Sequence, residues 1–177
     1  LAGAGDGAMA AVGTFAVGAY STYVVVADFA GVGDRELATA NDQLLTVLYQ
    51  QADGRFGATQ QVYIGDTVPP LWIDAGVIAS ADVDANGRPD IALVNGNLSA
   101  LMVLFNNAPL GGGRDVPRWL VRQWPSARGP VGLTVLDGGA VLLTVPDQML
   151  FTELALGMPE ADWKVEKTAD QKVVNAG

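Results

Sequence analysis

Short apolar segments separated by polar turns recur along the chain. Residues 23–27, 72–81 and 91–94 are rich in β-branched and small apolar side chains, and clusters of Gly, Asp and Asn bound them. Runs of this length and composition are typical of β-strands. The pattern therefore predicts an all-β protein built from short strands.

The most distinctive polar segment is residues 81–95. Oxygen-bearing side chains occupy positions 1, 3, 5 and 9 of a loop whose sixth residue is Gly87, and these residues are Asp82, Asp84, Asn86 and Asp90. Oxygen ligands at alternate positions, with a glycine at the sharp turn, can wrap a hard cation such as Ca²⁺. The carbonyl of Arg88 is the expected ligand at position 7. The alternative is a hairpin turn without metal, because Asp, Asn and Gly favour turns in any case.

An EF-hand begins in the same way but differs later. It requires a bidentate Glu at position 12 and a helix on each side, whereas position 12 here is Leu93 and both flanks have strand character. The sequence therefore predicts a calcium loop that joins two strands.

A repeat of 54 residues relates this loop to an earlier one, since Asp28 precedes Asp82 by that distance. The flanking strands also match, with the segment from Leu44 aligned to the segment from Leu101. A third copy begins near residue 131, where the segment from Leu37 aligns with the segment from Leu142 and the loop has shrunk to a turn at Asp137. A period in the 50s with four short strands is typical of β-propeller blades.

Residues 82–95, Asp-Val-Asp-Ala-Asn-Gly-Arg-Pro-Asp-Ile-Ala-Leu-Val-Asn, resemble the FG-GAP or VCBS repeat, the calcium-loop blade of integrin-like β-propellers. Residues 53–58, Asp-Gly-Arg-Phe-Gly-Ala, resemble the turn that separates blades in that family, and residues 13–16 and 106–113 hold similar turns. The resemblance covers residues 12–156 and implies blade boundaries near residues 54 and 111. Residues 1–11 are expected to be irregular, and residues 157–177 to form an outer strand and a polar tail.

Three four-stranded blades form only part of a propeller, because closed rings typically have 4 to 8 blades. We therefore expect a partial or oligomer-completed β-propeller, finished by another copy, by further sequence or by a different protein subunit.

The first loop keeps few ligands. Asp28 holds position 1 and Glu36 position 9, but Ala30 and Val32 stand at positions 3 and 5. Asp34, at position 7, can compensate only in part. This loop is expected to be a vestigial metal site or a plain turn.

Composition excludes several classes of function. The chain of 177 residues has no cysteine and no histidine, so disulfides, thiol nucleophiles and zinc–thiolate sites are ruled out. Its net charge of −9 argues against a nucleic-acid binder, and no apolar run approaches the length of a membrane span.

The chain begins at Leu1 without a signal sequence, so we expect a processed product or a part of a longer protein.

Arginine and tryptophan concentrate in residues 114–128. Arginine beside an aromatic ring can bind a polyanion, a glycan or a protein partner, and the candidate residues are Arg114, Arg118, Trp119, Arg122 and Trp124. The alternative is an outer strand whose tryptophans pack while its arginines are solvated.

No nucleophile elbow, phosphate loop or dinucleotide fingerprint is present. A carboxylate pair such as Asp137 and Asp147 is weak support for acid/base catalysis, so we expect no enzyme. The sequence favours a calcium-stabilised binding or assembly module in an extracellular or periplasmic setting, secreted or at the cell surface. A lectin-like module and a polymerising structural subunit are the alternatives.

Overall fold

The computed structural model describes residues 2–3, 9–10, 13–18, 21, 23–41, 44–64, 75–95, 100–107, 117–125, 132–135, 140–145 and 150–155, and within them every regular element is a β-strand. The all-β class predicted from the sequence is confirmed. Arg114, Asp137, Asp147 and the expected C-terminal strand and tail lie outside the described residues.

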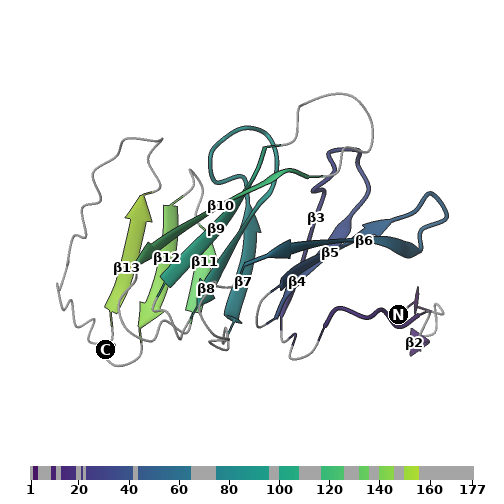
Figure 1. Ribbon diagram of the computed structural model, residues 1–177, viewed down its shortest axis with the longest axis horizontal. Coiled ribbons are helices and arrows are strands. Elements are labelled where there is room, and N and C mark those ends of the chain that lie inside the picture. Colours follow the sequence, from purple (N-terminus) through teal and green to yellow (C-terminus); the bar gives the residue numbers. More distant parts are fainter. Residues whose placement is uncertain are drawn as a thin grey trace, which may run out of the picture.

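The first and second sheets are four-stranded antiparallel meanders, in which strands adjacent in sequence pair in space (Figure 1). The first sheet contains β3 (Val24–Ala27), β4 (Glu36–Ala40), β5 (Leu44–Gln50) and β6 (Phe56–Tyr63). The second contains β7 (Ala75–Ala81), β8 (Asp90–Asn95), β9 (Ala100–Asn106) and β10 (Trp119–Pro125).

The third sheet has three described strands, β11 (Gly132–Val135), β12 (Ala140–Val145) and β13 (Leu150–Ala155). Near the N-terminus, β1 (Ala2–Gly3) pairs with β2 (Met9–Ala10), so the segment expected to be irregular contains a short antiparallel pair.

Strand pairing refines the repeat. Leu37 lies opposite Leu48 in the first sheet, and Ile91 lies opposite Leu104 in the second, so β5 matches β9 with Leu44 at the place of Ala100. The sequence alignment of Leu44 with Leu101 is thus displaced by one residue. Nearly every residue of β9 is buried on both faces, and a continuous apolar run carries no alternation that fixes the register.

The turn at residue 54 lies inside the first sheet. The Gln51 N–H donates to the Arg55 carbonyl, and the hairpin leads from β5 directly into β6, which pairs with β5. The blade boundary expected near residue 54 therefore lies within the first sheet. The hydrogen-bonded sheets themselves divide between β6 and β7.

The sheets stack face to face. One cluster lies between the first and second sheets and includes Leu45 and Val47 from one side and Ile91, Leu93 and Leu104 from the other. A second cluster joins the opposite face of the second sheet, through Ala92, Val94, Leu101 and Val103, to Leu133 and Val135 of the third. The second sheet is therefore covered on both faces.

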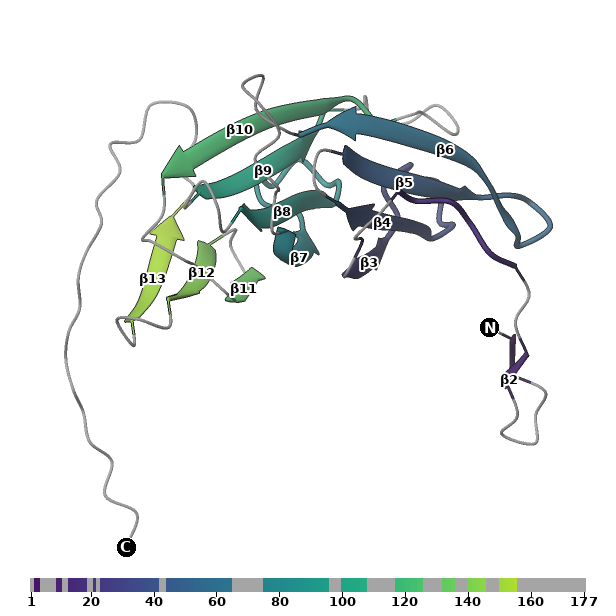
Figure 2. The same cartoon turned by 60° about the horizontal axis from the view of Figure 1, so that its bottom comes forward.

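The stack curves. Figure 2 shows the three sheets side by side in an arc, with β3, β7 and β11 on its concave side and β6 and β10 on its convex side. The first strands of the sheets contact one another in the order β3, β7, β11. Gln60 of β6 joins the first two sheets. Its Nε2 donates to the Pro117 carbonyl (2.9 Å), and its Oε1 accepts from the Trp119 indole N–H (3.0 Å).

Candidate metal centre

The loop between β7 and β8 takes its shape from its own side chains. Asp82 accepts hydrogen bonds from the backbone N–H of Asn86 (3.0 Å) and of Gly87 (2.8 Å). Ala85 and Gly87 adopt left-handed conformations, with φ of 58° and 84°. These two positive φ values wrap the chain around the Asp82 carboxylate and join two strands, as the sequence analysis expected.

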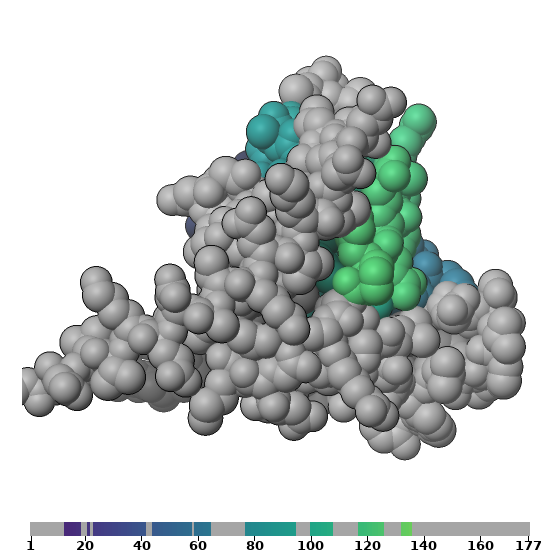
Figure 3. Space-filling view, turned by 90° about the vertical axis from the view of Figure 1, so that its left-hand side faces the viewer, coloured from purple at the N-terminus to yellow at the C-terminus, as the bar shows by residue number. Residues whose placement is uncertain are grey.

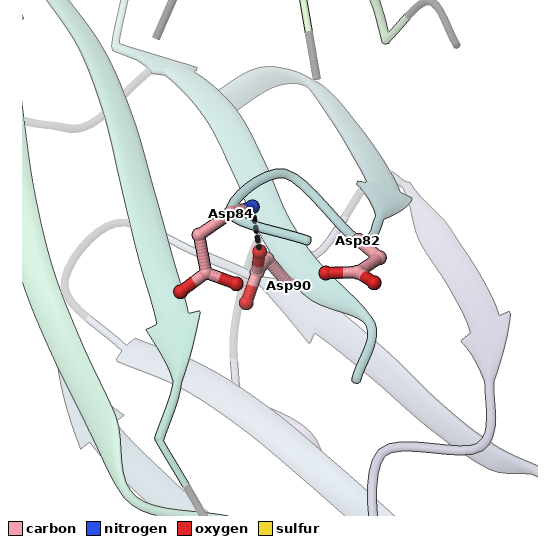
Figure 4. A group of neighbouring side chains, drawn as sticks. All are labelled: Asp82, Asp84 and Asp90. Carbon is pink, nitrogen blue, oxygen red and sulfur yellow. Dashed lines mark hydrogen bonds between the residues drawn. The ribbon is translucent and has the colours of Figure 1, made fainter. Parts of the chain in front are cut away.

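Three carboxylates gather inside this loop. Each of Asp82, Asp84 and Asp90 offers an oxygen, and these oxygens all lie within 4.8 Å of one another. In Figure 4 the carboxylate of Asp90 lies between those of Asp82 and Asp84. Asp90 starts β8 and is buried, Asp84 is half-buried and Asp82 is exposed, so the cluster runs from the protein interior to solvent.

Asp90 is the buried anchor of the cluster. Its Oδ2 accepts from the N–H of Val83 (2.8 Å) and of Asp84 (3.4 Å), and its Oδ1 accepts from the N–H of Asn106 (2.8 Å). The pKa of Asp90 is raised to about 6: burial is the main cause and repulsion from Asp84 adds to it, while these backbone hydrogen bonds oppose the rise. A cation beside Asp90 would favour the ionised form that burial disfavours.

The donor set fits a hard cation. It consists of oxygen atoms only, which suits Ca²⁺ or Mg²⁺ and not a thiolate- or imidazole-seeking metal. Asn86 lies beside the cluster with its nitrogen toward it: Nδ2 donates to Asp84 Oδ2 (3.2 Å), while Oδ1 accepts from the Arg88 N–H (2.9 Å). Ligation by Asn86 through oxygen requires its amide to turn, which would exchange the contact with Asp84 for a contact with the ion.

The first loop has the same backbone hydrogen bonds with fewer ligands. Asp28 accepts from the N–H of Val32 (3.0 Å) and of Gly33 (2.8 Å), the same two contacts that Asp82 makes 54 residues later. Gly31 and Gly33 have positive φ at the places of Ala85 and Gly87. The two loops are therefore structural copies.

Glu36 takes the place of Asp90 in the first loop. It is buried, its Oε2 accepts from the Ala30 N–H (3.1 Å), and burial raises its pKa; the neighbouring carboxylates of Asp28 and Asp34 raise it less. Within the described ranges, three carboxylates come together only in the second loop. The first loop thus holds its fold without a full set of ligands.

The two loops touch each other through residues whose side chains the sequence analysis did not single out. Arg88 is buried, and its Nη1 donates to the Ala30 carbonyl of the first loop (3.1 Å). Asn106, also buried, donates through Nδ2 to the Phe29 carbonyl (2.8 Å). The sequence did contain one signal, namely that Arg88 stands where the first loop has Asp34, so the two copies differ in charge at that position.

Asn106 also ties this junction to the acidic cluster. Its carbonyl accepts from Asn86 Nδ2 (3.1 Å), and its N–H donates to Asp90. One residue at the end of β9 therefore contacts two candidate ligands and the first loop.

The arginine and tryptophan segment lies on β10, at the surface of the second sheet (Figure 3, green). Trp119 packs edge-on against Phe29 with ring centroids 5.7 Å apart, and Trp124 packs edge-on against Phe105 at 6.3 Å. Both indoles are partly buried, whereas Arg118 and Arg122 are exposed. This arrangement is what the packing alternative describes: the two tryptophans pack, and these two arginines are exposed to solvent.

A membrane-spanning helix is not found among the described residues. A scan against protein-family models found no match, and neither the curated proteins nor the solved structures contained a significant relative.

Proposed function

We propose that this chain is a calcium-stabilised binding and assembly module with propeller-type blades of the FG-GAP or VCBS kind, acting outside the cytoplasm. The observation that carries the proposal is the convergence of Asp82, Asp84 and Asp90 within 4.8 Å, with Asp90 buried. Three carboxylates at this spacing repel one another, and a divalent cation removes that repulsion.

The chain's own residues have distinct roles in this proposal. Asp82, Asp84 and Asp90 supply carboxylate oxygens, and Asn86 and the Arg88 carbonyl complete the set. The bound ion supplies charge neutralisation, and its binding free energy adds to the stability of the folded loop. Because Asn106 and Arg88 join this loop to the first sheet, the gain extends to the junction between two sheets.

The architecture supports the propeller part of the proposal. Each of the first two sheets is a four-stranded meander, and the first strands of successive sheets adjoin on the concave side of an arc (Figure 2). Radial repetition of such sheets is the design of propellers. The environment follows from the ion, since loops of this kind belong where free Ca²⁺ is high, as in extracellular or periplasmic space.

Thermal melting with calcium tests the proposal, and the first loop provides the matched control. Asp82→Ala and Asp28→Ala each remove an aspartate that accepts the same pair of backbone N–H groups, but only Asp82 belongs to the acidic cluster. We expect both variants to melt below the unmodified protein. Millimolar Ca²⁺ should raise the Tm of the unmodified protein and of Asp28→Ala by several degrees, and that of Asp82→Ala little or not at all.

Identical melting curves of the unmodified protein with Ca²⁺ and with chelator would refute the metal site. A parallel series in Mg²⁺ identifies the ion, because Mg²⁺ demands near-octahedral geometry and retains its waters. A larger Tm shift with Mg²⁺ than with Ca²⁺ would argue against calcium.

A further inference from the structure

The loop between β7 and β8 contains an asparagine followed directly by a glycine, Asn86 and Gly87. The backbone nitrogen of the second residue of such a pair can attack Cγ of the asparagine, which closes a five-membered imide ring and releases ammonia. Glycine obstructs this attack least, because it has no Cβ. Gly87 is exposed and has a φ of 84°, so water reaches the pair. The pair is therefore a candidate site of covalent modification.

The loop has a group in contact with each atom that the reaction changes. The attacking nitrogen must lose its proton, and the Gly87 N–H donates to Asp82 Oδ2 (2.8 Å). The side-chain oxygen must carry negative charge in the tetrahedral intermediate, and Asn86 Oδ1 accepts from the Arg88 N–H (2.9 Å). The leaving nitrogen gains a proton and positive charge, and Asn86 Nδ2 donates to the carboxylate of Asp84 (3.2 Å). A base, an oxyanion donor and a stabilising carboxylate thus surround one amide.

The first loop provides an internal comparison for these contacts. Asp28 accepts from the Gly33 N–H (2.8 Å), as Asp82 does from the Gly87 N–H, but Val32 stands where the second loop has Asn86. The carboxylate contact is therefore common to both loops, whereas the amide beside it belongs to the second loop only. An exchange at Asp28 makes the same local change without a reactive amide.

We propose that Asn86 is a site of self-modification, at which the loop converts the side-chain amide into a carboxylate. The Asn86 side chain turns from the Asn106 carbonyl, which its Nδ2 contacts (3.1 Å), toward the backbone nitrogen of Gly87. That nitrogen bonds to Cγ while its proton passes to Asp82. The bond between Cγ and Nδ2 then breaks, and the departing nitrogen takes up this proton and leaves as ammonia.

Solvent water completes the reaction by opening the imide. Addition of water at Cγ breaks the new bond to the Gly87 nitrogen and leaves an aspartate at position 86. Addition at the backbone carbonyl carbon breaks the original peptide bond instead and leaves an isoaspartate, whose backbone is longer by one methylene. Both products carry a negative charge where Asn86 had none.

The modification changes the acidic cluster, and this consequence rests on the cation site proposed above and specifies its regulation. An aspartate at position 86 adds a fourth carboxylate to those of Asp82, Asp84 and Asp90. Repulsion in the metal-free loop then rises, and so does attraction for a divalent cation. Modification of Asn86 would therefore make the stability of the loop more dependent on the ion.

The test follows the mass of residue 86 while the full chain is incubated near neutral pH in metal-depleted buffer, made with water enriched in the heavy oxygen isotope. Fragmentation of the peptides separates Asn86 from the other Asn–Gly pair, residues 95 and 96. We expect residue 86 to exchange its amide for an acid that carries the heavy oxygen. The conversion should be faster in the folded protein than in denaturant, because the base and the oxyanion donor are in place only in the folded loop.

Two matched variants isolate the base. Asp82→Asn keeps an oxygen at this place but removes the negative charge, and should slow the conversion of Asn86 about 10-fold or more. Asp28→Asn makes the same exchange in the first loop and should leave the rate unchanged. Circular dichroism establishes that both variants are folded.

An amide at residue 86 that persists in the folded protein would overturn the inference. Equal rates in the folded protein, in denaturant and in Asp82→Asn would overturn it too, since the dipeptide alone would then set the rate. Equal slowing by Asp82→Asn and Asp28→Asn would show that Asp82 has no specific role, with the same result.

Melting of Asn86→Asp tests the regulation separately. We expect a lower Tm than that of the unmodified protein in chelator and a larger rise of Tm with Ca²⁺. An equal rise in the two proteins would overturn the regulatory role. The absence of any rise in the unmodified protein would refute the cation site, whereas the mass of residue 86 decides the modification independently.

Discussion

At the scale of single residues, the two loops show how one backbone accommodates different side chains. Gly31 and Ala85 are equivalent and both have positive φ, 69° and 58°. A Cβ at Gly31 would collide with the guanidinium of Arg88, whereas Ala85 is exposed. The glycine is therefore required by a neighbour from the second loop as well as by its own conformation.

This asymmetry predicts opposite effects of two exchanges. Gly31→Ala should lower the free energy of unfolding by about 2 kcal/mol or more, since left-handed strain is compounded by the displacement of Arg88. Ala85→Gly removes similar strain without a new contact, and should change stability by less than about 1 kcal/mol, without destabilising. Urea unfolding of both variants checks this, and equal losses would show that Arg88 does not restrict the first loop.

Asp90 predicts a pH dependence that changes sign with metal. Burial raises its pKa to about 6, so the metal-free folded state holds more protons than the unfolded state between pH 4 and 6. Its contribution to the free energy of unfolding therefore falls as pH rises through that window, by roughly 3 kcal/mol at most for a shift of about two pKa units. With Ca²⁺ the trend reverses, because protons compete with the ion for the ionised carboxylate.

Unfolding free energies at pH 4.5 and 7, for the unmodified protein and for Asp90→Asn, isolate this effect. The difference between the two proteins should shrink at pH 7 in metal-depleted buffer and grow at pH 7 in Ca²⁺. A difference that is independent of pH under both conditions would mean that Asp90 has an ordinary pKa.

At the scale of elements, the end of β9 holds the first two sheets together. Asn106 is fully buried and donates to the carbonyls of Phe29 and Pro89, while its own backbone contacts Asp90 and Asn86. Asn106 therefore contacts two loops that are far apart in sequence.

Asn106→Ala should lower the free energy of unfolding by about 2 to 3 kcal/mol, because it leaves the buried Phe29 carbonyl without its donor. Its neighbour provides the control, since Asn107 is exposed and Asn107→Ala should cost no more than about 0.5 kcal/mol. The Ca²⁺-induced shift in Tm should also be smaller in Asn106→Ala. Similar stability of the two variants would argue against a role of this side chain in joining the sheets.

At the scale of the whole molecule, the three sheets form a curved stack in which each contacts its neighbour. Val47 lies in the cluster between the first and second sheets, and Val103 lies in the cluster between the second and third. Both are fully buried, and the second sheet separates them.

Val47→Ala and Val103→Ala should each lower the free energy of unfolding by about 2 kcal/mol, from two lost methyl groups and the cavities they leave. Since the two sites share no cluster, the double variant should equal the sum of the single variants within about 0.5 kcal/mol. Chemical denaturation of all three variants measures this. A coupling above about 1 kcal/mol would mean that the two cores respond as one unit.

The sequence by itself determined the local structure. Strand composition gave the all-β class, and the 54-residue repeat together with the spacing of Asp82, Asp84 and Asp90 located the acidic loop between two strands. These features depend on residues close together in the chain, so spacing is sufficient to recognise them.

Only the tertiary structure decided which groups meet across the sheets. The register of β9, the burial of Arg88 and Asn106 against the first loop, and the packing of Trp119 on Phe29 depend on contacts between residues far apart in sequence. A strand buried on both faces carries no alternation, and a polar residue in a turn does not reveal which carbonyl it will reach. The physical reason is that such contacts are set by how whole sheets stack, a property that no single segment encodes.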